Sequence, residues 1–263
     1  ENENIVQYLS KDIKTLIGFY NVFKKIKPDI VLNYTIKPNI YGNIACALLG
    51  IKTINNISGL GTVFIKESLV TKLVKWLYKY SLSKSSQVFF QNSDDRDLFI
   101  QNKLVQRDKC DLLPGSGIDT NKFILIEYKN EDGIFKFLLI ARMLWDKGVG
   151  EYLEAAKIVK SKYPNVEFQL LGLLDVANNT AISKEQMQEW VNKGLVNYLG
   201  KTDNVKEFIK KADCVVLPSY REGTPRALLE SASMSKPLIA TNVPGCKEVV
   251  DDGINGYLCE VRN

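Results

Sequence analysis

Short runs of β-branched and aromatic residues alternate along this chain with longer segments in which apolar residues recur at helical spacing. In the first half the short runs lie at 29–32, 52–57 and 87–91, and the longer segments span 9–26, 38–50 and 66–85. Short apolar runs of this kind are typical of buried parallel strands, and their alternation with helices predicts β-α-β units. The first half is therefore expected to form part of a doubly wound α/β domain.

A second series of the same kind occupies the other half of the chain. Its expected strands lie at 135–140, 166–171, 213–217 and 237–240, and its expected helices at 148–162, 183–193, 203–211 and 225–235. The polar residues 130–133 are typical of a linker or exposed turn, which places a domain boundary near residue 124. A length of 263 residues suits two domains, expected at 1–124 and 125–263.

The amino-acid composition excludes some classes of function but does not identify a single one. The chain is 45% hydrophobic and 25% charged with a net charge of +5, as in an ordinary globular protein. Its lysines are dispersed and accompany no nucleic-acid-binding motif, so a nucleic-acid partner is not expected. Histidine is absent, which excludes Ser-His and Cys-His catalytic pairs. Five scattered cysteines without a C-x-x-C pair argue against a disulfide framework or zinc site and favour a reducing cytoplasm.

The segment 216–230 carries the most informative motif. An apolar strand runs into a loop and then into a helix, for which Thr224 is a suitable N-cap and Pro225 a suitable first residue. The backbone N–H groups of Arg226 and Ala227 would then point out of the helix start, where the helix dipole favours an anion such as a diphosphate. Gly223 allows the backbone to approach a ligand closely.

Two carboxylates flank this predicted anion site. Glu222 lies in the loop and Glu230 lies within the helix, and both side chains can accept hydrogen bonds from sugar or ribose hydroxyls. The alternative is that Glu222 is a solvated loop charge and that Glu230 pairs with a lysine. The spacing alone leaves both interpretations open.

Two cations follow the strand predicted at 135–140. Arg142 and Lys147 come at the strand end, just before a helix, which is where ligands of open α/β sheets collect. Both side chains could neutralise the growing charge of a diphosphate leaving group. The alternative is a pair of surface cations near a helix start.

Taken together, these motifs resemble those of family 4 glycosyltransferases. The shared elements are an R-x4-K-G run from Arg142 to Gly148, an E-x7-E run from Glu222 to Glu230, V-P-G-C-K-E at 243–248 and D-G-I-N-G at 252–256. Residues 35–42 and the Gly59-Leu60-Gly61 run are similar to the acceptor-side domain of bacterial members that build surface polysaccharide or lipid-linked oligosaccharide. The resemblance covers nearly the whole chain.

The resemblance implies a GT-B fold, in which two Rossmann-like, doubly wound parallel-sheet domains face a cleft. Residues 1–124 would be an acceptor-side domain lacking its opening strand and glycine-rich loop, and residues 125–263 a donor-binding domain lacking its last helices. It also implies a retaining, metal-independent and cofactor-free transfer of a hexosyl or N-acetylhexosaminyl group from a nucleotide-diphosphate sugar, expected to be a UDP-sugar. The expected acceptor is a glycan, lipid-linked through a diphosphate.

Roles for single residues are also implied by the resemblance. Arg142 and Lys147 would hold the diphosphate and Glu222 would touch the transferred sugar, which makes these three the expected catalytic residues. The remaining expected positions are the donor-binding residues Gly223, Thr224, Pro225, Arg226 and Glu230, and the acceptor-side residues Lys37, Gly59 and Gly61. Lys37 follows Ile36, which occupies a position where family members often carry histidine, and is a candidate acceptor-phosphate ligand.

The segment 66–84 interleaves aromatic and aliphatic residues with lysines. Basic amphipathic helices of this composition can lie on anionic membranes, so this segment is a candidate contact with the cytoplasmic face of the inner membrane. The alternative is a helix that faces the core and carries solvated lysines. Two other functions also remain open: a non-catalytic nucleotide-sugar-binding subunit of a transferase complex, and a GT-B sugar-nucleotide epimerase.

Overall fold

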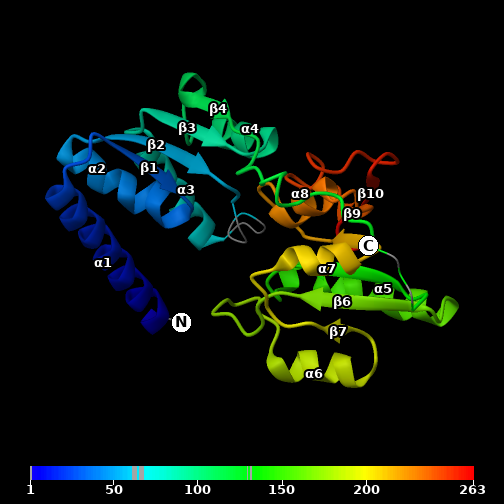
Figure 1. The fold of residues 1–263 in the computed structure, drawn as a ribbon. Coiled ribbons are helices and arrows are strands. Elements are labelled where there is room, and N and C mark those ends of the chain that lie inside the picture. Colours follow the sequence, from blue (N-terminus) through cyan, green and yellow to red (C-terminus); the bar gives the residue numbers. More distant parts are fainter. Residues whose placement is uncertain (1, 61–63, 65–67, 129, 131) are drawn as a thin grey trace. The chain divides into compact units, whose positions relative to one another are not determined.

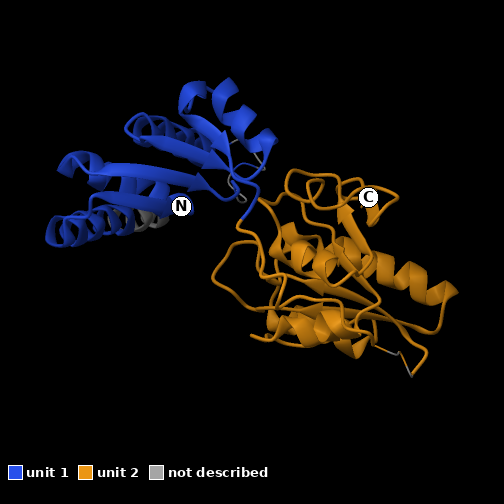
Figure 2. Ribbon diagram, turned by 45° about the horizontal axis from the view of Figure 1, so that its top comes forward, with its two compact units in different colours: residues 1–115 blue, residues 116–263 orange. Residues whose placement is uncertain are grey.

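The chain divides into two compact units, which span Glu1–Gly115 and Ser116–Asn263 (Figure 2). The computed structural model describes residues 2–60, 64, 68–128, 130 and 132–263. The division precedes the boundary expected near residue 124, because Phe123 is buried in the core of the second unit. There the Ser233 Oγ donates a hydrogen bond of 2.5 Å to the Phe123 carbonyl oxygen.

The first unit contains a parallel sheet with the strand order β1-β2-β3-β4 (Figure 1). Its described elements are α1 Asn2–Ile26, β1 Ile30–Tyr34, η1 Pro38–Gly42, α2 Asn43–Leu49, β2 Lys52–Ile57, α3 Leu69–Leu82, β3 Gln87–Phe90, α4 Ser93–Gln101, η3 Arg107–Lys109 and β4 Cys110–Leu112. The four strands follow one another in sequence order. The described part of this unit therefore shows the expected parallel sheet without a reversal of strand order.

A network of buried polar side chains ties α2 and α3 to the sheet of the first unit. Asn43, which is fully buried, donates hydrogen bonds to the Ser81 carbonyl oxygen at 2.6 Å and to the Ser85 Oγ at 3.0 Å. Its own Oδ1 accepts a hydrogen bond from Thr53 of β2 at 2.5 Å. Asn55 of β2 also donates to the Ser85 Oγ at 2.5 Å. These bonds compensate the cost of burying polar groups and fix the helices in one register on the sheet.

The second unit contains a parallel sheet with the strand order β10-β9-β8-β5-β6-β7. Its described elements are β5 Phe135–Ile140, η4 Trp145–Lys147, α5 Val149–Lys162, β6 Val166–Leu171, α6 Lys184–Asn192, β7 Asn197–Tyr198, α7 Val205–Lys211, β8 Cys214–Leu217, α8 Arg226–Ser233, β9 Leu238–Thr241 and β10 Gly256–Cys259. The chain moves outward from β5 to β7 and then returns to place β8 on the other side of β5. This order is that of a doubly wound nucleotide-binding fold, with its switch point between β5 and β8.

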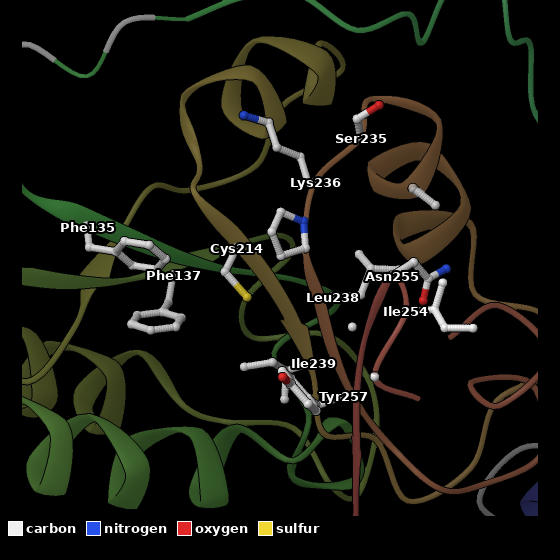
Figure 3. Close-up of a pocket in the computed structure, with 14 residues that line it drawn as sticks. Phe135, Phe137, Cys214, Ser235, Lys236, Leu238, Ile239, Ile254, Asn255 and Tyr257 are labelled. Atoms are coloured by element: carbon white, nitrogen blue, oxygen red, sulfur yellow. The ribbon is translucent and has the colours of Figure 1, made fainter. Parts of the chain in front are cut away.

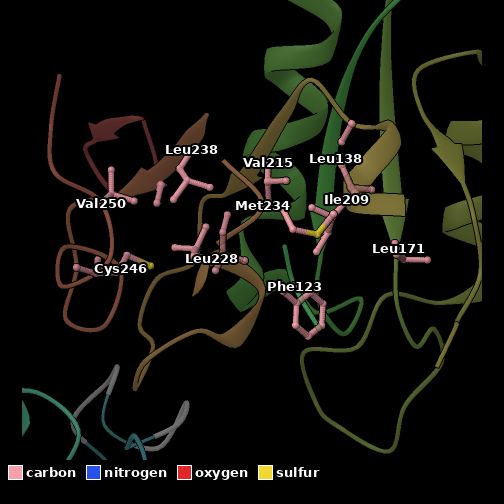
Figure 4. Packing of buried hydrophobic residues seen from close by; sticks show 14 residues of the cluster. Phe123, Leu138, Leu171, Ile209, Val215, Leu228, Met234, Leu238, Cys246 and Val250 are labelled. Carbon is pink, nitrogen blue, oxygen red and sulfur yellow. The ribbon is translucent and has the colours of Figure 1, made fainter. Parts of the chain in front are cut away.

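Both faces of the second sheet are buried, which explains the continuous apolar runs of its strands. On one face Leu138 and Val215 pack with Leu228 and Met234 of the α8 region, as Figure 4 shows. On the other face Cys214 packs in the cluster that contains Tyr152 of α5. Cys214 is therefore a buried thiol that packs as a small core hydrophobe.

The sequence did not predict the strands β4, β7 and β10 or the helix α4. The strands β4 and β7 hold three and two residues, too few to form a recognisable apolar run. The strand β10 is only partly buried, and α4 is mostly polar with Phe99 as its deeply buried apolar anchor. The segment predicted as one helix at 38–50 instead begins with a π-helical turn, η1, before α2.

Replacing Asn43 with alanine should destabilise the first unit. The change leaves the buried Thr53 and Ser85 hydroxyls without their Asn43 partner, and losses of this kind cost about 2–4 kcal/mol. The free energy of unfolding, measured by urea denaturation, should fall by that amount.

Asn102→Ala is the matched control, because the Asn102 side chain also donates a hydrogen bond to a carbonyl oxygen but is exposed. That variant should stay within about 0.5 kcal/mol of the parent protein. Equal losses for the two variants would contradict a structural role for the buried network.

Candidate functional site

The candidate site lies at the carboxyl ends of β5 and β8, where the strand order of the second sheet reverses. The segment from Ala141 to Gly148, called the β5 loop, follows β5, and the segment from Pro218 to Pro225, called the β8 loop, follows β8. Parallel strands bring both segments to the same edge of the sheet, which is the place where open α/β sheets bind ligands. The two motifs that the sequence singled out separately therefore meet at one edge.

The centre of this edge is an ion pair between Lys147 and Glu222. The Lys147 Nζ lies 2.5 Å from the Glu222 Oε1, and the two side chains are 19% and 14% exposed. The Ser219 Oγ donates a second hydrogen bond to the same oxygen at 2.7 Å. Glu222 is therefore not the solvated loop charge that remained open from sequence. Because water is largely excluded, the pair should interact more strongly than an exposed one.

Two glycines allow the loops to meet this closely. Gly148 has a φ of +72°, and a Cβ there would lie 2.0 Å from the Pro218 carbonyl oxygen. Gly245 has a φ of +89°, and a Cβ there would lie 2.2 Å from the Gly223 carbonyl oxygen. At both positions a side chain would overlap the backbone of the β8 loop. Only glycine can adopt the positive φ and also fit in the space available.

Backbone hydrogen bonds hold the β8 loop between its two neighbours. The Tyr220 N–H donates to the Asp146 carbonyl oxygen in the β5 loop at 3.0 Å. The Glu222 N–H donates to the Pro244 carbonyl oxygen in the segment after β9 at 3.2 Å. The Glu222 carboxylate is thus presented by a loop that is anchored on both sides.

The helix α8 begins one residue later than the sequence predicted. Its first residue is Arg226 and its N-cap is Pro225, with φ −73° and ψ 115° and no side-chain capping bond, so the assignment of Thr224 as N-cap was wrong. The backbone of Pro225 is extended, and its carbonyl oxygen accepts the first helical hydrogen bonds, from Leu228 and Leu229. The N–H groups of Arg226 and Ala227 remain in the first turn, where they cannot form intrahelical bonds.

Glu230 and Arg226 form a second ion pair one turn apart on α8. The Arg226 Nη2 lies 3.0 Å from the Glu230 Oε1, and the side chains are 64% and 10% exposed. The partner of Glu230 is therefore an arginine rather than the lysine considered from sequence. Burial raises the pKa of Glu230, while the positive charges of Arg226 and Lys122 oppose that rise. The carboxylate is thus a largely desolvated acceptor beside a charged donor.

Glu230 lines a hollow of about 350 Å³ beside the β5 end. Its lining includes Lys122, Phe123, Asp203, Val205 and Arg226. Sequence reasoning missed Lys122 and Asp203. Asp203 follows β7, and the two-residue length of that strand concealed the loop after it. Lys122 lies in an irregular segment before β5 that offered no periodic signal.

Arg142 lies beside the ion-paired centre rather than in it. Its side chain is exposed and lines a second hollow of about 210 Å³, together with Gly172, Lys201 and Thr202. Ile140 and Val205 line both this hollow and the one beside Glu230. Arg142 and Glu230 therefore line adjacent hollows along the carboxyl edge of the sheet.

The expected acceptor-side residues lie in the first unit. Lys37 follows β1 in an exposed position, and its Nζ lies 3.0 Å from the Asp12 Oδ1 of α1. Gly59 follows β2 with a φ of +119°. Gly61 lies outside the described residues.

A larger hollow, of about 630 Å³, lies at the opposite end of the second sheet (Figure 3). It is lined by Phe135, Cys214, Leu238 and Gly256, the first residues of β5, β8, β9 and β10. None of the residues that the sequence singled out for ligand contact lines this hollow. The size of a hollow therefore does not by itself identify the candidate functional site.

Two family models match the chain. Residues 122–263 match the model described as glycosyl transferases group 1. Residues 4–92 match the model described as glycosyl transferase 4-like. The first match includes the whole carboxyl edge of the second sheet.

Curated relatives with known activities are similar over almost the entire chain. An N,N'-diacetylbacillosaminyl-diphospho-undecaprenol alpha-1,3-N-acetylgalactosaminyltransferase from Campylobacter jejuni is 28% identical and aligns with 95% of this chain and 69% of its own length. A UDP-Gal:alpha-D-GlcNAc-diphosphoundecaprenol alpha-1,3-galactosyltransferase from Escherichia coli is 27% identical, with coverages of 97% and 68%.

Solved structures share the fold at lower identity. Anabaena HepE in complex with UDP-glucose superposes with a TM-score of 0.77 at 18% identity and covers 94% of this chain and 68% of its own. Sucrose-phosphate synthase from Thermosynechococcus elongatus superposes with a TM-score of 0.76 at 17% identity, with coverages of 94% and 64%. These likenesses establish the architecture of the chain.

Replacing Gly148 with alanine should destabilise the second unit by about 3 kcal/mol. The left-handed backbone costs a side chain about 1–2 kcal/mol, and the overlap with Pro218 adds the remainder because the two loops must move apart. Urea denaturation followed by circular dichroism measures the loss.

The control is Gly194→Ala. Gly194 has a similar φ of +66°, but a Cβ there would meet nothing within 4 Å. That variant should lose only about 1 kcal/mol, the conformational part of the penalty. If both variants lost the same amount, the contact between Gly148 and Pro218 would not constrain the loops.

Proposed function

The chain belongs to the glycosyl transferases group 1 family and is a glycosyltransferase of GT-B fold, and we propose that its donor is a UDP-sugar bound at the β5/β8 switch point. The proposed reaction moves a hexosyl or N-acetylhexosaminyl group from a UDP-sugar to a glycan acceptor with retention of configuration. The observation that carries this proposal is the convergence of Lys147, Glu222 and the α8 start at the β5/β8 switch point.

In this proposal the diphosphate binds to cations and backbone N–H groups without a metal ion. Lys147 and Arg142 come from the β5 loop, and the N–H groups of Arg226 and Ala227 come from the first turn of α8. A helix start together with two cations can stabilise the charge that grows on the leaving diphosphate. Among the residues that the structure describes, no three acidic, cysteine or histidine side chains are grouped as a metal site.

Glu222 is the proposed contact with the transferred sugar. Its Oε1 already accepts hydrogen bonds from Lys147 and Ser219, so this oxygen is occupied and less available to take a proton from the acceptor. A donor phosphate oxygen is then the better candidate to take the proton from the acceptor hydroxyl. That assignment supports retention, in line with the resemblance of the motifs to retaining family members.

Glu230 is proposed to bind the ribose hydroxyls, and the hollow beside it to hold the nucleoside. The carboxylate is nine-tenths buried at the wall of a 350 Å³ hollow, next to the α8 start that would hold the phosphates. The choice of uridine draws on the similar proteins, since the Escherichia coli relative uses UDP-Gal by name and HepE was solved with UDP-glucose.

The proposed acceptor is a glycan carried on a lipid diphosphate, as in surface polysaccharide or oligosaccharide biosynthesis. The names of the Campylobacter jejuni and Escherichia coli relatives both specify a diphospho-undecaprenol-linked sugar. Lys37 of the first unit is the candidate acceptor-phosphate ligand, with Gly59 and Gly61 in the adjoining acceptor-side segment.

The helix α3 is proposed to contact the cytoplasmic face of the membrane that carries such an acceptor. Tyr78 and Leu82 on its inward side are buried in the core, so this side of the helix faces the core as the alternative interpretation expected. Its outward side exposes Leu69, Leu73, Trp76 and Tyr80 beside lysines at 72 and 79. The rings of Trp76 and Tyr80 stack with centroids 6.1 Å apart.

An apolar stripe flanked by lysines suits the boundary of an anionic bilayer, where aromatic rings reach the headgroup level and lysines meet lipid phosphates. None of the described helices is both long enough and apolar enough to cross a bilayer. The cytoplasmic side is proposed because all five cysteines are unpaired thiols.

Lys147→Ala and Arg142→Ala should each weaken UDP binding about tenfold, because each removes a charged donor to the diphosphate. Glu230→Ala should weaken UDP binding as well but leave the affinity for inorganic pyrophosphate unchanged. Calorimetric titration in EDTA, with UDP, GDP, ADP and pyrophosphate as probes, measures all of these affinities.

Lys157→Ala is the control, because Lys157 forms an exposed ion pair with Glu154 of the same helix α5, at 2.6 Å. It should bind UDP like the parent protein. If Lys147→Ala bound UDP with unchanged affinity, the proposal that Lys147 binds the diphosphate would be wrong. If UDP binding required a divalent metal ion, the proposal of a metal-free donor site would be wrong.

The double variant Trp76→Ala, Tyr80→Ala should reduce binding to vesicles that contain phosphatidylglycerol by about tenfold, since the two rings supply much of the exposed apolar area of α3. Co-sedimentation measures the bound fraction. The control variant Ile158→Ala, Tyr163→Ala removes an exposed aliphatic and an exposed aromatic side chain from the second unit and should bind like the parent. Unchanged binding of the α3 variant would leave this helix with a core-packing role alone.

A further inference from the structure

Tyr220 connects the two loops that meet at the switch point. Its N–H donates to the Asp146 carbonyl oxygen, one residue before Lys147. Its hydroxyl donates to the Glu151 Oε1 in the first turn of α5 at 2.6 Å. The Arg262 guanidinium carbon lies 4.6 Å from the centre of its ring. Tyr220 is therefore anchored at its backbone, its hydroxyl and its ring face, two residues before Glu222.

Glu151 is a fixed acceptor for this hydroxyl. It lies in the first turn of α5, where the helix dipole favours a negative charge. Its second oxygen, Oε2, is buried and has no hydrogen-bond partner among the described residues. A buried carboxylate oxygen without a partner is costly, so the bond from Tyr220 compensates a charge that is otherwise poorly solvated.

The Tyr220 hydroxyl remains a donor at neutral pH. Burial raises its pKa, and the hydrogen bond to Glu151 raises it further, while Arg262 opposes the rise. The phenol is consequently protonated at neutral pH and donates its proton to the hydrogen bond with the Glu151 carboxylate.

We infer that Tyr220 is a positioning residue for the donor site: anchored on Glu151, it holds the turn from Ser219 to Glu222 so that the Glu222 carboxylate meets the transferred sugar. The inference rests on the proposed role of Glu222. Tyr220 itself need not touch the donor. Without its hydroxyl bond the turn keeps the Lys147 ion pair, the Ser219 hydrogen bond and its two backbone bonds, but it loses the side-chain anchor on α5 that restrains the position of the carboxylate.

The test uses Tyr220→Phe and Glu151→Ala, which each remove the same hydrogen bond, and Glu151→Gln, which keeps an acceptor oxygen in place. Calorimetry compares UDP with the tightest binder among UDP-glucose, UDP-galactose, UDP-N-acetylglucosamine and UDP-N-acetylgalactosamine. Tyr220→Phe and Glu151→Ala should weaken UDP-sugar binding about tenfold and UDP binding less than about twofold. Glu151→Gln should stay near the parent protein.

A double-mutant cycle separates positioning from general destabilisation. In a Glu222→Gln background, Tyr220→Phe should cause no further loss of UDP-sugar affinity, because its effect passes through Glu222. Tyr152→Phe is the control: the hydroxyl of this buried tyrosine donates to the Phe137 carbonyl oxygen at 2.9 Å, away from the site. That variant should leave the ratio of the two affinities unchanged.

Hydrogen exchange tests the anchor without any nucleotide. The amides of Tyr220 and Glu222 are hydrogen-bonded to neighbouring loops, and their exchange should accelerate about tenfold in Tyr220→Phe and in Glu151→Ala. The double variant should exchange no faster than either single one.

The outcomes distinguish this inference from the proposed function. If the parent chain binds UDP-sugar and Tyr220→Phe changes neither the affinity ratio nor the exchange rates, the inference is overturned. Equal effects of Tyr220→Phe and Tyr152→Phe would also overturn it. If the parent chain binds no nucleotide while exchange accelerates as expected, the proposed donor site fails but the anchoring of the loop by Tyr220 is supported.

Discussion

The close backbone contact between Gly148 and Pro218 is the constraint on which the rest of the site depends. It exists because β5 and β8 are neighbours in the sheet although many residues separate them in sequence. The contact sets the separation of the two loops, and that separation allows Lys147 to reach Glu222. Gly245 extends the same arrangement to the segment after β9, so three loops converge on one carboxylate.

Four of the charges in this site form two ion pairs. Lys147 with Glu222 and Arg226 with Glu230 each combine a carboxylate that is shielded from water with a cation. Removing one partner would leave an uncompensated charge, which is costly in a half-buried setting. In the proposed function both carboxylates would exchange a protein donor for a ligand hydroxyl, and the cations would turn toward phosphate oxygens.

The two units differ in how they place polar and charged side chains. The first fixes its helices to the sheet through neutral asparagine, serine and threonine side chains, with Asn43 at the centre. The second uses an almost wholly apolar core, and two ion pairs, Lys147 with Glu222 and Arg226 with Glu230, lie at the carboxyl edge of its sheet. Helix α3 adds an outward apolar stripe that its own unit does not cover among the described residues.

The sequence by itself determined the α/β class, the bounds of β2, β5 and β6, and the motifs that carry Lys147, Glu222 and Glu230, because apolar periodicity and motif spacing are local properties. Only the tertiary structure decided that β8 lies beside β5, that Lys147 pairs with Glu222, and that Tyr220 is anchored on Glu151. These contacts join residues far apart in the chain, and no local pattern encodes them. Strands of two or three residues, such as β7, escaped detection for the same reason: their neighbours in the sheet stabilise them.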